Sequence, residues 1–160
     1  MKKVELIVLD ADGVLTDGKL YIGPNGEEFK SFHVKDGMGL SLARHFGIKT
    51  AIITGRRSEA VRVRKEELRI DYLFEGISNK REVLASLSAD LKIPFEHIFY
   101  MGDDLNDLPA IELAGFSAAP SDAVIAVKKA VHYISPFPGG SGAVRDAIDL
   151  ILSQREDYLE

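Results

Sequence analysis

The sequence predicts an α/β fold in which a parallel β-sheet carries helices on both faces. Short apolar runs rich in β-branched residues alternate with amphipathic stretches of helical spacing, which is typical of strand-helix-strand units. The chain has 160 residues, enough for one domain with a sizeable core but short for two. No repeat, low-complexity tract or linker interrupts the sequence. We therefore expect residues 1–160 to form a single domain.

Five apolar runs and four amphipathic stretches supply the elements of this domain. The strands are expected at residues 4–9, 49–54, 71–74, 97–101 and 115–119. The helices are expected at residues 38–46, 58–68, 80–91 and 107–114. Because ligands bind such a sheet at the carboxyl ends of its strands, the residues that follow each strand are the first candidates for a site.

A β-hairpin insert, at about residues 18–35, breaks the alternation after the first strand. Extended stretches at residues 19–23 and 28–34 flank a Pro-Asn-Gly turn. A lone hairpin is marginally stable in water, so its apolar side chains must be buried against the body of the domain or against another subunit. These side chains are Leu20, Ile22, Phe29, Phe32 and Val34.

Composition excludes several classes of function. The net charge of −5 and the isoelectric point near 5.4 argue against sequence-independent binding to nucleic acid or to an anionic membrane. The absence of cysteine rules out disulfides, thiolate nucleophiles and thiolate metal sites. No stretch is long and apolar enough to span a membrane. We expect a cytoplasmic protein with no nucleic-acid or membrane partner.

Two aspartates follow the first strand in the stretch VLDADGVLTDG. Asp10 and Asp12 would point the same way in an extended chain, while Gly13 lets the chain turn and leaves room for a cation between oxygens. A solvated acidic turn explains this pair, taken alone, as well as a metal site does. A calcium loop is excluded by spacing, since Leu15 and Tyr21 stand where that loop needs glycine and glutamate.

A second acidic cluster, GDDLND (102–107), follows the fourth strand. Helix capping would explain Asp104 or Asp107, but it does not explain why a further acidic group stands at the same edge as the first pair. Three carboxylates within this cluster, Asp103 included, repel one another unless a cation offsets them. Oxygen ligands favour a hard cation, with Mg²⁺ ahead of Ca²⁺.

Two further strand ends carry groups that could bind phosphate. Thr54 and Gly55 end the second strand, where a hydroxyl and free backbone N–H groups suit a phosphate oxygen, although Thr-Gly also serves ordinary turns. Lys80 begins the helix after the third strand, a position where the helix dipole disfavours a cation. That lysine is therefore either close to an anion or simply solvated.

The order of these motifs resembles that of the haloacid dehalogenase (HAD) superfamily of aspartate-dependent phosphotransferases. Asp-x-Asp-Gly-x-x-x-Asp precedes Thr-Gly, then the lysine, then Gly-Asp-Asp-x-x-Asp, within residues 4 to about 119. A receiver domain of bacterial signalling also combines an acidic pair, a phosphoacceptor aspartate, a threonine and a lysine. Its phosphoacceptor follows the third strand, whereas Asp10 follows the first. A catalytically idle scaffold is disfavoured because every catalytic position is filled.

The resemblance implies a catalytic role for each strand end. Asp10 would be the nucleophile that forms an aspartyl-phosphate, and Asp12 would protonate the leaving alkoxide and later deprotonate water. Thr54, Gly55 and Lys80 would bind the phosphate.

The resemblance also implies a magnesium site. Mg²⁺ would be held by the side chain of Asp10, the backbone carbonyl of Asp12 and Asp103. Asp104 and Asp107 would be outer partners of the metal and of the catalytic lysine.

The chain more closely resembles the family of 3-deoxy-D-manno-octulosonate (KDO) 8-phosphate phosphatases of lipopolysaccharide biosynthesis. That family lacks a mobile cap domain, and here the hairpin after the first strand is too short to be one. The motifs that carry the resemblance are DADGVLTDG, HVKDGMGL, ITGR, EGISNK, GDDLND and PGGSGAVRDAIDL. The resemblance implies a homotetramer with hairpins at the subunit interface.

An acidic sugar phosphate requires local cations in an acidic protein. The candidates for substrate binding are Arg56, Lys35 and Arg62, together with His33 on the hairpin beside the site. The resemblance leaves open a related substrate, a nine-carbon keto-deoxy acid (KDN or sialic acid) 9-phosphate. Arg56 after Thr-Gly fits the eight-carbon enzyme.

Overall fold

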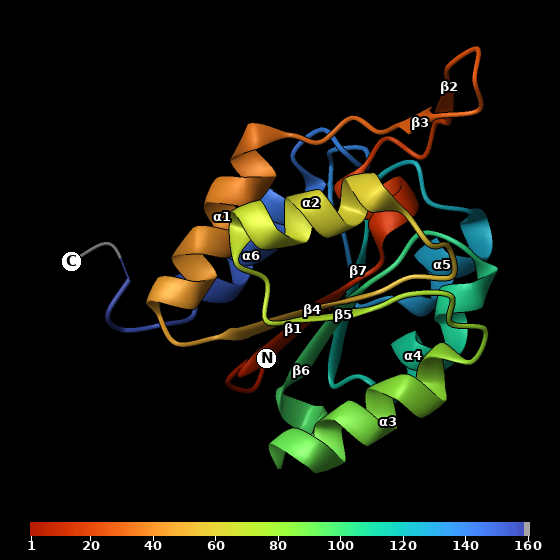
Figure 1. The fold of residues 1–160 in the computed structure, drawn as a ribbon. Helices are drawn as coiled ribbons and strands as arrows, with labels where there is room; N and C mark the ends of the chain where they lie inside the picture. Colours follow the sequence, from red (N-terminus) through yellow and green to blue (C-terminus); the bar gives the residue numbers. More distant parts are fainter. Residues whose placement is uncertain (159–160) are drawn as a thin grey trace.

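The computed structural model describes residues 1–158 and has a six-stranded, fully parallel β-sheet at its centre (Figure 1). The strands lie in the order β5-β4-β1-β6-β7-β8. Their bounds are β1 Leu6–Leu9, β4 Lys49–Ile53, β5 Tyr72–Phe74, β6 Ile98–Met101, β7 Phe116–Ala119 and β8 Tyr133–Ile134. The first strand in sequence thus lies inside the sheet, between β4 and β6.

Helices cover both faces of this sheet, as the sequence predicts (Figure 1). One face packs on α1 (Val34–His45), α2 (Glu59–Leu68) and α6 (Ala143–Ser153). The other face packs on α3 (Lys80–Leu91), α4 (Leu108–Leu113) and α5 (Ile125–Ala130). Successive residues of β1 alternate between the two cores: Ile7 and Leu9 belong to the first and Leu6 and Val8 to the second. None of these helices, which lie within residues 1–158, meets the length and hydropathy of a membrane span.

The hairpin is shorter than predicted. Its strands are β2 (Tyr21–Ile22) and β3 (Glu28–Phe29), and α1 already begins at Val34. The prediction of a strand over 28–34 is wrong because the His33 side chain accepts a hydrogen bond from Lys35 N and starts a helix there.

The apolar side chains of the hairpin divide into two groups. Phe32 packs against the core. Leu20, Ile22, Phe29 and Val34 are between 46% and 80% exposed in the single chain. Contact with the body of the domain therefore buries only part of the apolar surface of the hairpin, although we expected all of it to be covered.

The loop before α6 packs directly on the turn that follows β1. Gly140 N donates a hydrogen bond to the carbonyl oxygen of Val14, and a Cβ atom at Gly140 would lie 2.4 Å from the backbone nitrogen of Asp17. Gly140 also has a φ of +69°, a conformation that favours glycine. The two loops fit together only because this residue has no side chain.

We predict that Gly140→Ala destabilises the protein by about 2 kcal/mol more than Gly47→Ala does. Gly47 has a similar φ of +78°, but no heavy atom of residues 1–158 lies within 4 Å of its virtual Cβ, so its substitution measures the backbone strain alone. Urea unfolding of both variants gives the comparison. Equal free energies of unfolding would show that the loop adapts without strain.

Candidate active site

The carboxyl edge of the sheet brings the predicted strand-end residues together. Leu9 pairs in register with Ile52 of β4 and Met101 of β6, so Asp10 emerges beside the ends of both neighbours. Asp10 N donates a hydrogen bond to the carbonyl oxygen of Met101. The expectation that these strand ends share one edge is met because β1 is flanked by the two strands that carry the other motifs.

A polar hollow of about 220 Å³ opens at this edge. Its lining residues are Asp10, Asp12, Gly18, Thr54, Gly55, Arg56, Asp103, Asp104 and Asn106. Seven of these nine were predicted as site residues, and the exceptions are Gly18 and Asn106. Lys80 and Asp107 are buried, and Lys80 contacts Asp10 of the lining.

Lys80 is held between two buried carboxylates. Its Nζ lies 3.0 Å from Asp10 Oδ2 and 2.8 Å from Asp107 Oδ1. Tyr100 donates its hydroxyl hydrogen to the same Asp107 oxygen at 2.6 Å. The other Asp107 oxygen accepts hydrogen bonds from the backbone N–H groups of Asp103 and Asp104. The lysine at the start of α3 is therefore close to anions, and Asp107 has its oxygens occupied.

Burial and charge set the protonation of this group. Burial opposes the Lys80 ammonium, but Asp10 and Asp107 outweigh it and raise the pKa of Lys80. Burial also opposes the Asp107 carboxylate, yet Lys80 and the hydrogen bonds from Lys80 and Tyr100 hold its pKa below the usual value. Burial, and then repulsion from Asp107, raises the pKa of Asp10 well above its usual value.

Asp103 lines the hollow, and its carboxylate is less stabilised than that of Asp107. Burial, and then repulsion from Asp107 and Asp104, raises its pKa to about 7. Oxygens of Asp10, Asp103 and Asp107 all lie within 4.8 Å of one another. Asp10 and Asp103 line the hollow, whereas Asp107 lies outside its lining and is engaged by an ammonium, a hydroxyl and two backbone N–H groups. Asp10 and Asp103 are therefore the carboxylates placed to bind a cation. Clustered oxygen ligands of this kind suit a hard divalent ion.

Gly13 lets Asp103 approach the turn after β1. A Cβ atom at Gly13 would lie 1.9 Å from Asp103 Oδ2 and its φ is +84°. Gly13 therefore has two roles: it allows the predicted turn, and it makes room for the carboxylate of Asp103, which follows β6.

Asp104, predicted as an outer partner of the metal and of the lysine, caps the turn that follows β6. Its side chain accepts a hydrogen bond from Leu105 N, and Asp104 and Asp107 form a reciprocal capping box around the turn at residues 105–107. This is the helix-capping alternative that the sequence left open. Asp107 also contacts Lys80, the contact that the resemblance implies.

Two residues of the hairpin that were not among the predicted site residues, Glu28 and Lys30, reach the site. Lys30 forms an ion pair with Asp12 Oδ1, and Glu28 pairs with Lys30 and with Arg56. The period-two alternation of a strand puts Glu28 and Lys30 on one face and Phe29 on the other, and this was the signal that could have identified them.

Three predicted substrate residues lie elsewhere in the single chain. His33 and Lys35 line a second hollow beside Phe137 and Arg145, whereas Arg62 pairs with Glu59 and Glu75. Of the predicted substrate residues, only Arg56 lines the polar hollow at the strand ends.

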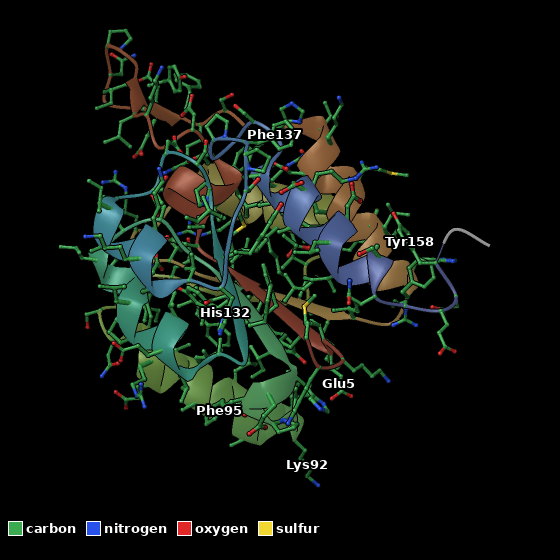
Figure 2. All side chains as sticks on the ribbon, turned by 180° about the vertical axis from the view of Figure 1, so that it is seen from behind. Glu5, Lys92, Phe95, His132, Phe137 and Tyr158 are labelled. Carbon is green, nitrogen blue, oxygen red and sulfur yellow. The ribbon has the colours of Figure 1, made fainter. Side chains whose placement is uncertain are left out.

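The remaining histidines serve packing or surface contacts. His132 accepts a hydrogen bond from Ser117 N and stacks on Phe116. His97 pairs with Glu5, which lies at the opposite end of the molecule from Phe137 (Figure 2).

The fold and the strand-end carboxylates define a hydrolase class, and the chain belongs to it. Residues 63–148 match the model of the haloacid dehalogenase-like hydrolase family. The 3-deoxy-D-manno-octulosonate 8-phosphate phosphatase KdsC of Escherichia coli K12 is 43% identical over 151 residues, which cover 94% of this chain and 80% of that protein. The chain is therefore a member of the haloacid dehalogenase-like hydrolases.

Solved structures show the same similarity. A probable YrbI family phosphatase from Pseudomonas syringae superposes with a TM-score of 0.93 and 43% identity, covering 95% of this chain and 86% of that one. The KDO 8-phosphate phosphatase of Moraxella catarrhalis, solved with magnesium, phosphate and KDO, has a TM-score of 0.92 and 39% identity over 94% of this chain and 86% of that one. These similarities confirm the predicted fold without a cap domain in residues 1–158, and the prediction of a phosphatase.

We predict that the affinity for Mg²⁺ rises with pH. Asp103, with its pKa raised to about 7, holds a proton at pH 5.5 and loses it by pH 8, and a metal must displace that proton to bind. The apparent Kd should fall by up to about tenfold per pH unit below pH 7 and level off above it. Calorimetric titration at several pH values measures the trend, and Asp103→Asn should weaken both the binding and its dependence on pH. A pH-independent Kd would contradict the assignment.

Proposed function

We propose that this chain is a Mg²⁺-dependent phosphomonoesterase that converts KDO 8-phosphate to KDO and phosphate through an aspartyl-phosphate. The observation that carries the proposal is the division of the first acidic pair. Asp10 is buried against the Lys80 ammonium, whereas Asp12 is partly exposed and faces the cations of Lys30 and Arg56. Two carboxylates two residues apart thus have the separate surroundings that two separate tasks require.

In the first step an Asp10 oxygen attacks phosphorus and the bond between phosphorus and the sugar oxygen breaks. Asp12 gives a proton to that oxygen, so the sugar leaves as an alcohol. In the second step water attacks the aspartyl-phosphate and Asp12 takes up the proton of the water. Inorganic phosphate leaves, and Asp10 returns to a carboxylate.

Positive charge must gather around the phosphoryl group, because an anion attacks an anion. Lys80 supplies an ammonium, and Thr54 and Gly55 supply a hydroxyl and a backbone N–H at the edge of the hollow. Mg²⁺ would be held by Asp10, Asp103 and the backbone carbonyl of Asp12, and when bound it would neutralise part of the phosphoryl charge. The ion pair between Lys80 and Asp107 keeps the ammonium charged before substrate binds.

The proposed substrate carries a carboxylate as well as a phosphate. Arg56 lines the hollow, is 49% exposed at its side chain, and offers a guanidinium that suits a carboxylate. His33, Lys35 and Arg62 lie away from this hollow, so the proposal for the single chain rests on Arg56. The names of the relatives support KDO 8-phosphate over a nine-carbon 9-phosphate.

We further propose that the chain acts as one cytoplasmic domain within a homotetramer. The exposed apolar side chains of the hairpin support an interface there, since Ile22 is 68% and Phe29 58% exposed. These features concern assembly and location, and the chemistry above does not depend on them.

We predict that Asp10→Asn abolishes phosphate release with the fold intact, because an amide is not a nucleophile for phosphorus at neutral pH. Malachite-green detection of phosphate measures activity, and far-UV circular dichroism checks folding. Asp90→Asn, an exposed aspartate on α3, is the matched control and should keep full activity. Turnover by Asp10→Asn would refute the nucleophile.

We predict that Arg56→Met lowers kcat/KM for KDO 8-phosphate by about 10- to 100-fold, the size expected for a charged hydrogen bond. Glucose 6-phosphate, which lacks a carboxylate, should lose less than about threefold. Arg57→Met is the control, because that guanidinium lies against Gly76 instead of lining the hollow. Equal losses of kcat/KM on both substrates would show that Arg56 does not bind the carboxylate of the substrate. A panel that includes KDN 9-phosphate tests chain length.

A further inference from the structure

Lys30 is a buried lysine that the reaction steps above do not use. Its side chain is fully shielded from solvent, and its ammonium contacts Asp12 Oδ1 and lies 3.4 Å from Glu28 Oε1. The hairpin supplies it, one residue after β3. Phe29, its neighbour, is 58% exposed, so the lysine is the more deeply buried of the two.

A buried ammonium is unfavourable unless carboxylates offset the lost hydration. A methionine of similar volume would fill this space without that penalty. We therefore look for a role of this ammonium other than packing, and its contact with the Asp12 carboxylate indicates that role.

The Asp12 carboxylate has a cation at each oxygen. Lys30 contacts Oδ1, and Arg56 Nε lies 3.9 Å from Oδ2. Glu28 closes the ring, since its oxygens lie 3.1 Å from Arg56 Nη2 and one of them pairs with Lys30. Two cations and two anions alternate, and each fixes the position of the next.

Lys30 is the better anchored of the two cations. The Arg56 side chain is 49% exposed and its contact with Asp12 is long, whereas the Lys30 side chain is buried and in direct contact. Arg56 can thus turn to a substrate while Lys30 keeps Asp12 in place.

We propose that Lys30 is a positioning residue, which holds the Asp12 carboxylate in line with the leaving oxygen while the proton is transferred. This inference rests on the proposed function, because it presumes that Asp12 protonates that oxygen. Through Lys30 the hairpin completes the site of its own chain and orients the acid.

The experiment compares two leaving groups. KDO 8-phosphate releases an alkoxide that needs a proton, whereas p-nitrophenyl phosphate releases a phenolate that leaves without one. Lys30→Met should lower kcat/KM for KDO 8-phosphate by about 10²-fold, the size typical of general acid catalysis, and that for p-nitrophenyl phosphate by less than about threefold. With KDO 8-phosphate the loss should fall on kcat, while KM changes little.

Chemical rescue tests the ammonium itself. The chain has no cysteine, so Lys30→Cys creates a unique thiol that 2-bromoethylamine converts to an aminoethyl thioether. Alkylation in denaturant, followed by refolding, should restore most of the KDO 8-phosphate activity that Lys30→Cys loses. Lys19→Cys, at an exposed position of the same segment, takes the same treatment and should show neither loss nor gain.

Several outcomes would overturn the inference. Equal losses on both substrates, no loss on either, an effect on KM alone, or no recovery after alkylation would each assign Lys30 another role. Lys30→Gln replaces Lys30→Met if the latter does not fold.

Asp12→Asn, measured alongside, separates this inference from the proposed function. The comparison uses kcat/KM, because Asp12 also takes the proton of water in the second step and its loss lowers kcat for either substrate. If Asp12→Asn lowers kcat/KM equally for both substrates, the acid is wrongly assigned and the role of Lys30 falls with it. If Asp12→Asn spares p-nitrophenyl phosphate and Lys30→Met does not, only the inference about Lys30 is wrong.

Discussion

The ammonium of Lys80, buried between Asp10 and Asp107, is the interaction on which the rest of the site depends. Three carboxylates with oxygens within 4.8 Å of one another could not share one edge of the sheet without positive charge among them. The helix dipole at the start of α3 opposes this lysine, and the two carboxylates overcome that opposition. Tyr100 of β6 and two backbone N–H groups of the turn after β6 fix Asp107, which in turn holds the lysine.

The site has an inner and an outer part with different physical character. The inner part is buried, hydrogen-bonded and built on strand ends, which suits attack at phosphorus in a fixed geometry. The outer part is a ring of ion pairs between the hairpin and Arg56, one of them long and half exposed. An ion pair near solvent can be broken and replaced by another at a small cost in free energy, whereas breaking a buried pair of the inner part has a large cost. The contact that we propose between Arg56 and substrate therefore lies in the part of the site that can rearrange.

The core of the sheet and the inner site were predictable from sequence because their signals are local. Buried parallel strands appear as short β-branched runs, and the functional groups directly follow them. Two elements near the end of the chain were not predictable, since α5 has six residues and β8 two, too few for a periodic pattern. The 11 residues of α6 were not predicted either, although its apolar residues recur at helical spacing. Lys30 was missed because its partner Asp12 is 18 residues away, and the placement of Lys35 and Arg62 depends on how α1 and α2 pack.

The interior place of β1 has a consequence for the order of events during synthesis. The first strand to leave the ribosome is apolar at all four positions, yet its partners β4 and β6 begin only at residues 49 and 98. Contacts of such long sequence separation form late and slowly. Asp10 and Asp103 consequently meet only after most of the chain exists, and Lys80, which lies between them in sequence, is already present when they do. The two carboxylates therefore never come together in a partly synthesised chain that lacks the lysine which offsets their repulsion.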